Sequence, residues 1–142
     1  MWIAGITNVF YGIILYIFMD KNSKFRKAIG NIGEELAEKY LLDNGFEIIK
    51  RNFIMWGGEL DIVATKNGRI HVIEVKTASE SSSIRPEENA HFKKMLKVAK
   101  IAEYYVVAVL KSNQPFHLHL ITVILDKDQK QIDLKFFENI EI

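Results

Sequence analysis

The stretch that decides the fold runs from Gly58 to Thr77 and reads GELDIVATKNGRIHVIEVKT. Its two halves are rich in β-branched residues and flank Asn67-Gly68, the strongest short signal for a two-residue hairpin turn. The pattern therefore predicts two antiparallel strands, at residues 59–66 and 69–77, with a register that the short turn fixes.

This predicted hairpin brings three acids and a lysine together. With a two-residue turn, Asp61 is expected opposite Glu74 and Glu59 opposite Lys76, all on one face of the strands. Two carboxylates about 4.5 Å apart repel by roughly 4 kcal/mol at an effective dielectric near 20. A small domain has only about 5–15 kcal/mol of net stability, so the arrangement is costly without a counter-ion. It predicts a divalent cation, Mg²⁺ or Mn²⁺, held by Asp61 and Glu74, with Lys76 stabilising negative charge or assisting a water.

The rest of the chain predicts a mixed α/β domain with the order αβββαββ, a mixed sheet flanked by helices. Within the first helix, Gly30 and Gly33 each cost about 1 kcal/mol relative to Ala, so close packing or a ligand is expected to require them. The predicted elements are helices from residue 22 or 23 to 45 and 91–110, and strands 46–53, 59–66, 69–77, 116–125 and 131–137.

Composition sets limits on function. The 142 residues suit one domain, and 49% hydrophobic residues exclude an intrinsically disordered chain. The absence of cysteine excludes disulfides, thiolate metal sites and a cysteine nucleophile. Because 19 basic residues face 18 acidic ones, any nucleic acid must be held by a local basic patch.

The first nineteen residues differ from the rest because none of them is charged. Residues 2–19 form an apolar run of about 27 Å as a helix, marginally enough to span a bilayer, and basic residues follow it. This predicts an apolar N-terminal helix at 1–19, tethering a cytoplasmic domain at 20–142 to the membrane. A translation start at Met19 and an extra packed helix are the alternatives.

Four segments resemble the YraN-like family of predicted endonucleases, which is part of the PD-(D/E)xK, or restriction-endonuclease-like, superfamily and is distantly related to Holliday-junction resolvases. The segments are GEELA at 33–37 with Tyr40-Leu41, Arg51-Asn52, GELDIV at 58–63 and IEVKT at 73–77. The resemblance covers roughly residues 24–142 and implies a restriction-endonuclease-like fold.

The resemblance also implies roles for single residues. Asp61 and Glu74 are implied metal ligands, Lys76 the catalytic lysine, and Glu34 a residue that completes the metal site or positions water. Glu59 is implied as a supporting residue, with a salt bridge to Lys76 as its alternative interpretation. The chain departs from the family pattern at Ala78, where an arginine is usual, at Thr122, where an aspartate is common, and at His91-Phe92, which replaces the usual Thr-Pro.

Basic residues of the second predicted helix suit a polyanionic partner. Lys93, Lys97 and Lys100 recur at helical spacing on one face, and Lys94 lies near the helix start. His117 and His119 alternate on one strand, but no third ligand accompanies them, so no zinc site is expected.

The sequence therefore predicts a metal-dependent endonuclease that hydrolyses phosphodiester bonds in nucleic acid, with DNA favoured. Branched or linear substrate and oligomeric state stay open. The alternatives are a catalytically weak or inactive nucleic-acid-binding module of the same fold, and a membrane-tethered interaction protein whose acids bind a structural cation.

Overall fold

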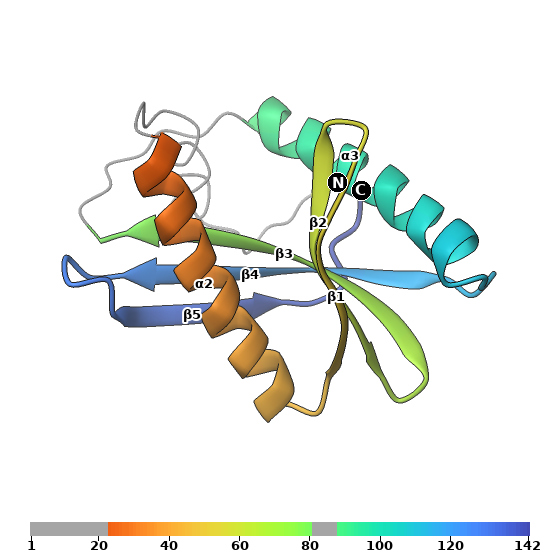
Figure 1. Ribbon diagram of the computed structural model, residues 1–142, viewed down its shortest axis with the longest axis horizontal. Coiled ribbons are helices and arrows are strands. Elements are labelled where there is room, and N and C mark those ends of the chain that lie inside the picture. The colour runs from red at the N-terminus through yellow and green to blue at the C-terminus, as the bar shows by residue number, and fades with distance from the viewer. Residues whose placement is uncertain (1–22, 81–87) are drawn as a thin grey trace.

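The computed structural model describes residues 23–80 and 88–142, with side chains for 27–80 and 93–142. Over these ranges the predicted order αβββαββ is confirmed, with a short π-helical turn, η1, added after the second helix (Figure 1). The elements are α2 (Ser23–Asp43), β1 (Glu47–Met55), β2 (Gly58–Lys66), β3 (Arg69–Ser79), α3 (Glu88–Tyr104), η1 (Tyr105–Val109), β4 (Phe116–Leu125) and β5 (Gln131–Phe137).

The five strands form one mixed sheet in the order β1-β2-β3-β4-β5. The β3–β4 pair is parallel, and the other three pairs are antiparallel. A parallel pair needs a long crossover, and α3 lies in the segment that connects β3 to β4. The prediction of a mixed sheet with helices against it is therefore confirmed.

Each face of the sheet has its own hydrophobic core. The face under α2 packs residues such as Leu41, Ile73 and Val123, and the face under α3 packs residues such as Val72, Met95 and Ile101. Figure 1 shows α2 lying across β3, β4 and β5, whereas α3 lies near the β1–β2 hairpin. The domain is thus a sheet between two helical layers, and both helices can bring side chains to its central strands.

The turns follow the sequence signals. Gly45 ends α2 with a φ of +83°, the left-handed conformation that glycine adopts without strain. Asn67 and Gly68 have φ values of +52° and +73°, as the predicted hairpin turn requires.

The two glycines inside α2 differ in what surrounds them. A Cβ on Gly33 would lie 1.7 Å from Thr77 Oγ1, so only glycine lets α2 approach β3 this closely. A Cβ on Gly30 would have no atom of the described residues within 4 Å. Close packing is confirmed for Gly33, whereas no described residue packs closely on Gly30.

The predicted apolar helix at 1–19 lies outside the described residues. Within the described ranges, neither helix has the length and apolar character needed to cross a membrane.

Candidate active site

The predicted register of the β2–β3 hairpin is confirmed from the turn as far as Ile62, which pairs with Ile73. Beyond Ile62, β2 pairs with β1 but no longer with β3. Two predicted cross-strand pairs are therefore wrong: Asp61 with Glu74, and Glu59 with Lys76.

The Asp61 side chain explains why the strands separate. Its Oδ2 accepts a hydrogen bond from the backbone N–H of Val75 at 2.8 Å, in a buried position. The Asp61 carboxylate thus accepts the hydrogen bond that a backbone carbonyl of β2 would otherwise accept from Val75 of β3. The two strands diverge around it and open a space that a side chain from α2 reaches.

Three carboxylates converge at this divergence. Oxygen atoms of Glu34, Glu59 and Asp61 all lie within 4.8 Å of one another, with Glu34 supplied by α2 and the other two by β2. Burial raises the pKa of Asp61 well above its usual value, and the nearby charge of Glu74 raises it further. Burial likewise raises the pKa of Glu34. Both acids therefore resist ionisation unless positive charge compensates them.

Glu74 is the acid that the protein's own lysines compensate. Its side chain is fully buried, and its Oε1 lies 3.0 Å from Lys76 Nζ and 2.5 Å from Lys94 Nζ. Although burial opposes ionisation, these two ammonium groups lower the pKa of Glu74 to about 2. Burial lowers the pKa of Lys76, whereas the charge of Glu74 raises that of Lys94 despite its burial. We call Glu34, Glu59, Asp61, Glu74, Lys76 and Lys94 together the acid site.

Strand β1 holds Glu34 in place through two residues whose roles the sequence alone did not reveal. Glu34 Oε2 accepts a hydrogen bond from Asn52 Nδ2 at 3.1 Å and lies 3.4 Å from Arg51 Nη2. Arg51 Nη1 in turn donates to Glu38 Oε2 at 2.6 Å. The Arg51-Asn52 pair in the family resemblance was the available signal, because it marked these positions without giving them a function.

The predicted site residues lie in two places, the acid site and the exposed surface of α3. The structure brings oxygen atoms of Glu34, Glu59 and Asp61 together, whereas Glu74, the third predicted metal ligand, pairs with two lysines. Lys76 forms its ion pair with Glu74 rather than with Glu59. Lys94 belongs to the acid site, whereas the other three lysines of the predicted nucleic-acid-binding set, Lys93, Lys97 and Lys100, are exposed on α3.

The donor set fits a hard divalent cation. Carboxylate oxygens are the protein ligands that Mg²⁺ prefers, and the three converging acids supply them from two elements. Glu74 Oε2 is also buried and has no hydrogen-bond donor among the described residues. Such an atom is costly unless a partner reaches it.

A second polar cluster lies on β3 and β4, and we call His71, His117 and His119 the histidine cluster; His119 is buried and the other two are half-buried. His119 Nδ1 accepts the backbone N–H of Asn139 at 3.0 Å, so its Nε2 carries the proton and donates to His71 Nδ1 at 2.7 Å. Burial and the neighbouring histidines lower the pKa of His119 to about 4. The three rings are nearly parallel, with interplanar angles of 26°, 21° and 10° for the three pairs.

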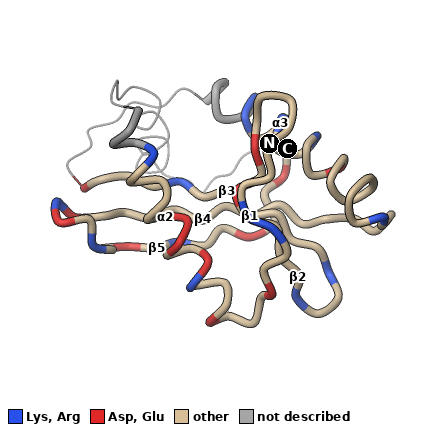
Figure 2. Tube along the Cα trace, in the orientation of Figure 1, with Lys and Arg blue, Asp and Glu red and all other residues tan. Residues whose placement is uncertain are grey.

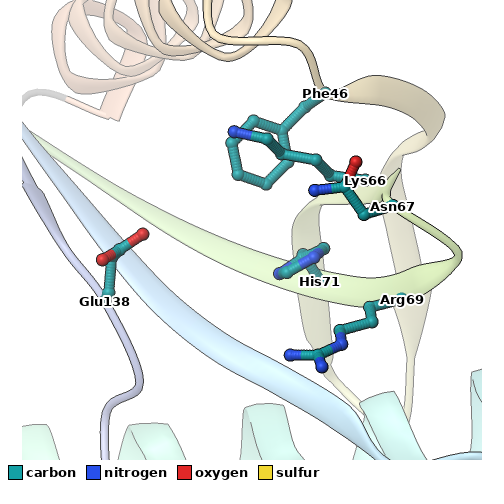
Figure 3. A pocket seen from close by; sticks show the side chains of 6 residues that line it. All are labelled: Phe46, Lys66, Asn67, Arg69, His71 and Glu138. Atoms are coloured by element: carbon teal, nitrogen blue, oxygen red, sulfur yellow. The ribbon is translucent and has the colours of Figure 1, made fainter.

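His71 also lines an open pocket of about 420 Å³ beside the β2–β3 turn (Figure 3). Lys66 Nζ lies 4.8 Å from the centre of the Phe46 ring, and Figure 3 shows its chain extending across that ring. The other lining residues are Asn67, Arg69 and Glu138. This pocket lies at the opposite end of the hairpin from the diverging strands, so it is separate from the acid site.

Comparison with known proteins identifies the family. Residues 33–134 match the uncharacterised protein family UPF0102. The chain belongs to this family. The sequence resemblance to the YraN-like family is thereby confirmed, because UPF0102 is that family.

Two UPF0102 relatives show how much of the chain is shared. A UPF0102 protein of Clostridium acetobutylicum is 36% identical over 116 residues, 82% of this chain and 95% of the relative. A UPF0102 protein of Thermodesulfovibrio yellowstonii is 37% identical over 112 residues, 79% of this chain and 98% of the relative. The match thus spans nearly the whole length of both relatives.

Two solved structures are also similar to the chain. They are an fdxN element excision controlling factor from Anabaena variabilis, with a TM-score of 0.37 and 16% identity, and an XisH family protein from Nostoc punctiforme, with 0.38 and 17%. The similarity covers 73% and 72% of this chain and 98% of each of those chains. TM-scores this low do not bear on function.

Proposed function

We propose that this UPF0102 protein is a metal-dependent nuclease that hydrolyses phosphodiester bonds in nucleic acid, with DNA favoured. The observation that carries the proposal is the convergence of three carboxylates beside a buried lysine, at the place where β2 and β3 separate. A site that keeps mutually repelling acids in a small domain is more readily explained by chemistry than by stability.

The carboxylates of the acid site would bind the metal ion. Glu34, Glu59 and Asp61 would hold Mg²⁺ or Mn²⁺, so that Glu59 takes the ligand role that the sequence gave to Glu74, whose Oε1 pairs with two lysines. A divalent cation in such a site supplies positive charge that stabilises the developing negative charge of the phosphate. The Asn52 and Arg51 contacts would keep the Glu34 carboxylate oriented toward the other two acids.

Lys76 would act on the reacting phosphate or on the attacking water. Glu74 fixes its ammonium group at 3.0 Å, so the charge is oriented before substrate binds. Because burial lowers the pKa of Lys76, its proton is held less tightly than that of an exposed lysine. The exposed lysines at 93, 97 and 100 would contact phosphates along the substrate backbone.

The decisive experiment is a cleavage assay with the full-length protein and Mn²⁺, on branched, single-stranded and duplex DNA and on RNA. We expect cleavage that a chelator abolishes and that Lys76→Ala lowers by about 100-fold or more, the usual cost of losing one oriented electrostatic group. Lys127→Ala, an exposed lysine in the β4–β5 turn, serves as the matched control and should cleave at the wild-type rate. Equal cleavage by Lys76→Ala and wild type would contradict the mechanism.

Two observations favour a second candidate, a nucleic-acid-binding module without catalysis. Lys76 and Lys94 already balance the charge of Glu74. The family-like positions Ala78 and Thr122 also lack the side chains that are usual there. Binding without cleavage on every substrate and with either metal would support this candidate instead.

A further inference from the structure

The turn of the β1–β2 hairpin contains a residue type that rarely adopts the backbone conformation found there. Trp56 and Gly57 form the two-residue turn between Met55 and Gly58, with φ values of +52° and +71°. A bulky side chain rarely adopts a positive φ, and asparagine or glycine is the usual choice at this turn position. The β2–β3 hairpin of the same chain follows that rule, because Asn67 precedes Gly68 in the same conformation.

The Trp56 side chain does not compensate for this strain by burial. It is 62% exposed, and its neighbour Ile54 is 71% exposed. The indole and the Tyr104 ring of α3 form a T-shaped pair with ring centres 5.1 Å apart, and Tyr104 is itself exposed. A strained position that holds an exposed aromatic side chain is a feature that function explains better than stability does.

The surroundings of this aromatic pair favour a polyanion over another protein. The hairpin lies directly on α3, because a Cβ on Gly58 would lie 2.9 Å from Ile101 Cδ1 and 3.1 Å from Lys97 Cε. On the described side chains of α3, four lysines (93, 94, 97 and 100) accompany one acid, Glu103. Figure 2 shows basic residues of α3 beside the hairpin. Charge complementarity therefore points to nucleic acid.

The same elements connect the aromatic pair to the acid site. Trp56 precedes Glu59 by three residues on the hairpin, a distance of about 10 Å along a strand. On α3, Lys94 contacts Glu74, Lys97 packs under the hairpin, and Tyr104 meets Trp56. A strand of nucleic acid whose phosphate lies at the acid site would thus extend along these lysines toward the two rings.

From this placement, and resting on the proposed nuclease function, we propose that Trp56 and Tyr104 form a stacking platform for unpaired nucleobases, so that the preferred substrate carries a single-stranded segment next to the cleaved bond. Aromatic side chains bind bases through their π-faces, which are accessible in single strands but not inside a duplex. The contact is tolerant of sequence, and the neighbouring lysines hold the backbone.

A binding experiment in chelator tests this proposal without requiring catalysis. The chain has two tryptophans, Trp2 and Trp56, so Trp2→Phe in the full-length protein leaves Trp56 as the only indole reporter. We expect a 12-nucleotide single strand to quench Trp56 fluorescence and to bind more tightly than the duplex of the same sequence. A single-stranded RNA of that sequence shows whether the platform distinguishes sugars.

Substitutions at the turn give the sharper measurement, made by polarisation of a labelled strand. Trp56→Asn should weaken single-strand binding by about 5- to 100-fold, as the loss of a base-stacking contact predicts, and change duplex binding less than twofold. It should also raise the thermal midpoint, because asparagine suits the positive φ, and this excludes misfolding as the cause of lost binding. Trp56→Phe should retain most of the affinity.

Ile54→Ala is the matched control, since Ile54 is an exposed apolar residue of the same hairpin without a ring. Its single-strand affinity should stay within twofold of wild type. The proposal is overturned if Trp56→Asn binds like wild type, if duplex and single strand bind equally, or if Ile54→Ala loses as much affinity as Trp56→Asn. Self-association that Trp56→Asn abolishes, with nucleic-acid binding unchanged, would identify a second copy as the occupant and also overturn it.

The outcome is distinguishable from failure of the nuclease proposal. Single-strand binding that depends on Trp56, without cleavage in Mn²⁺, would contradict the nuclease and support the platform. Cleavage that Trp56→Asn leaves unchanged on single-stranded and duplex substrates alike would contradict only the platform.

Discussion

Strand β3 contributes to two polar clusters whose hydrogen bonds and charges are satisfied in different ways. Near its start, His71 joins the histidine cluster, in which His119 accepts a hydrogen bond from the Asn139 N–H and donates one to His71. In the middle of β3, Glu74 and Lys76 form an ion pair within the acid site, and Glu74 Oε2 has no donor among the described residues. In the first cluster, the hydrogen bonds of His119 are made within the protein, as in a structural network. The second cluster has a buried carboxylate oxygen that a bound cation would satisfy.

The largest expected effect comes from removing one charge of the acid site. Asp61→Asn keeps an oxygen that can accept the Val75 N–H, so the fold should survive. We expect cleavage to fall by about 100-fold or more. Because burial and Glu74 raise the pKa of Asp61, stability in chelator should be unchanged or higher by about 1 kcal/mol.

Cleavage rate and urea unfolding check this prediction together. Asp128→Asn, in the exposed β4–β5 turn, is the matched control and should change neither quantity. Asp61→Asn that destabilises the protein strongly while retaining cleavage would make the acid site a structural network and remove the contrast with the histidine cluster.

The next prediction tests whether the packing of α2 against β3 positions Glu34 in the acid site, and the substitution changes no charged residue. Gly33→Ala would place a Cβ 1.7 Å from Thr77 Oγ1, so α2 must move off β3 and carry Glu34 away from Asp61. We expect a loss of about 3 kcal/mol, typical of overpacking, together with reduced cleavage at temperatures where the variant is folded.

Gly30→Ala is the control on the same helix, and open space at Gly30 predicts a gain of up to about 1 kcal/mol with full cleavage. Thermal unfolding of both variants measures these changes. Equal midpoints for Gly33→Ala and Gly30→Ala would mean that close packing of α2 does not position Glu34.

The smallest effect concerns the pH dependence of the histidine cluster. The folded pKa of His119, about 4, lies below the usual 6.5, so the unfolded chain binds the proton first as the pH falls. Stability should therefore be present above pH 6.5 and decline between about 6.5 and 4, and because solvent screens part of the shift, His119 should contribute on the order of 1 kcal/mol.

Urea unfolding of wild type and His119→Gln across this range isolates the contribution as a difference. The difference should appear mainly between pH 6.5 and 4, and His117→Gln, a more exposed ring, should alter it less. Parallel pH profiles for wild type and His119→Gln would show that His119 does not titrate on unfolding in this range.

The sequence predicted the fold well because local signals determined it. The Asn67-Gly68 turn fixed the register of β2 and β3, and the helical stripes and β-branched runs placed every described element in the correct order. The hairpin pattern placed Glu59, Asp61, Glu74 and Lys76 on neighbouring strands, but the predicted pairing between them was wrong.

The predicted arrangement of the acid site was wrong for a physical reason. Ideal strand pairing placed Asp61 opposite Glu74, but the Asp61 carboxylate replaces a backbone partner of Val75 and separates the strands. Neither the convergence of Glu34 with Glu59 nor the capture of Lys94 by Glu74 could be read from local patterns, because both depend on how α2 and α3 pack against the sheet. The predicted helix at 1–19 stays a prediction.

The measurement that tests the central claim most directly is the thermal midpoint of the full-length protein with and without Mn²⁺. If the acid site binds the ion, a concentration of 100 times Kd should stabilise the fold by about 2.7 kcal/mol. The shift should be lost in Asp61→Asn and kept in His119→Gln. Equal shifts in wild type and Asp61→Asn, or no shift in either, would contradict the claim that these converging acids form a cation site.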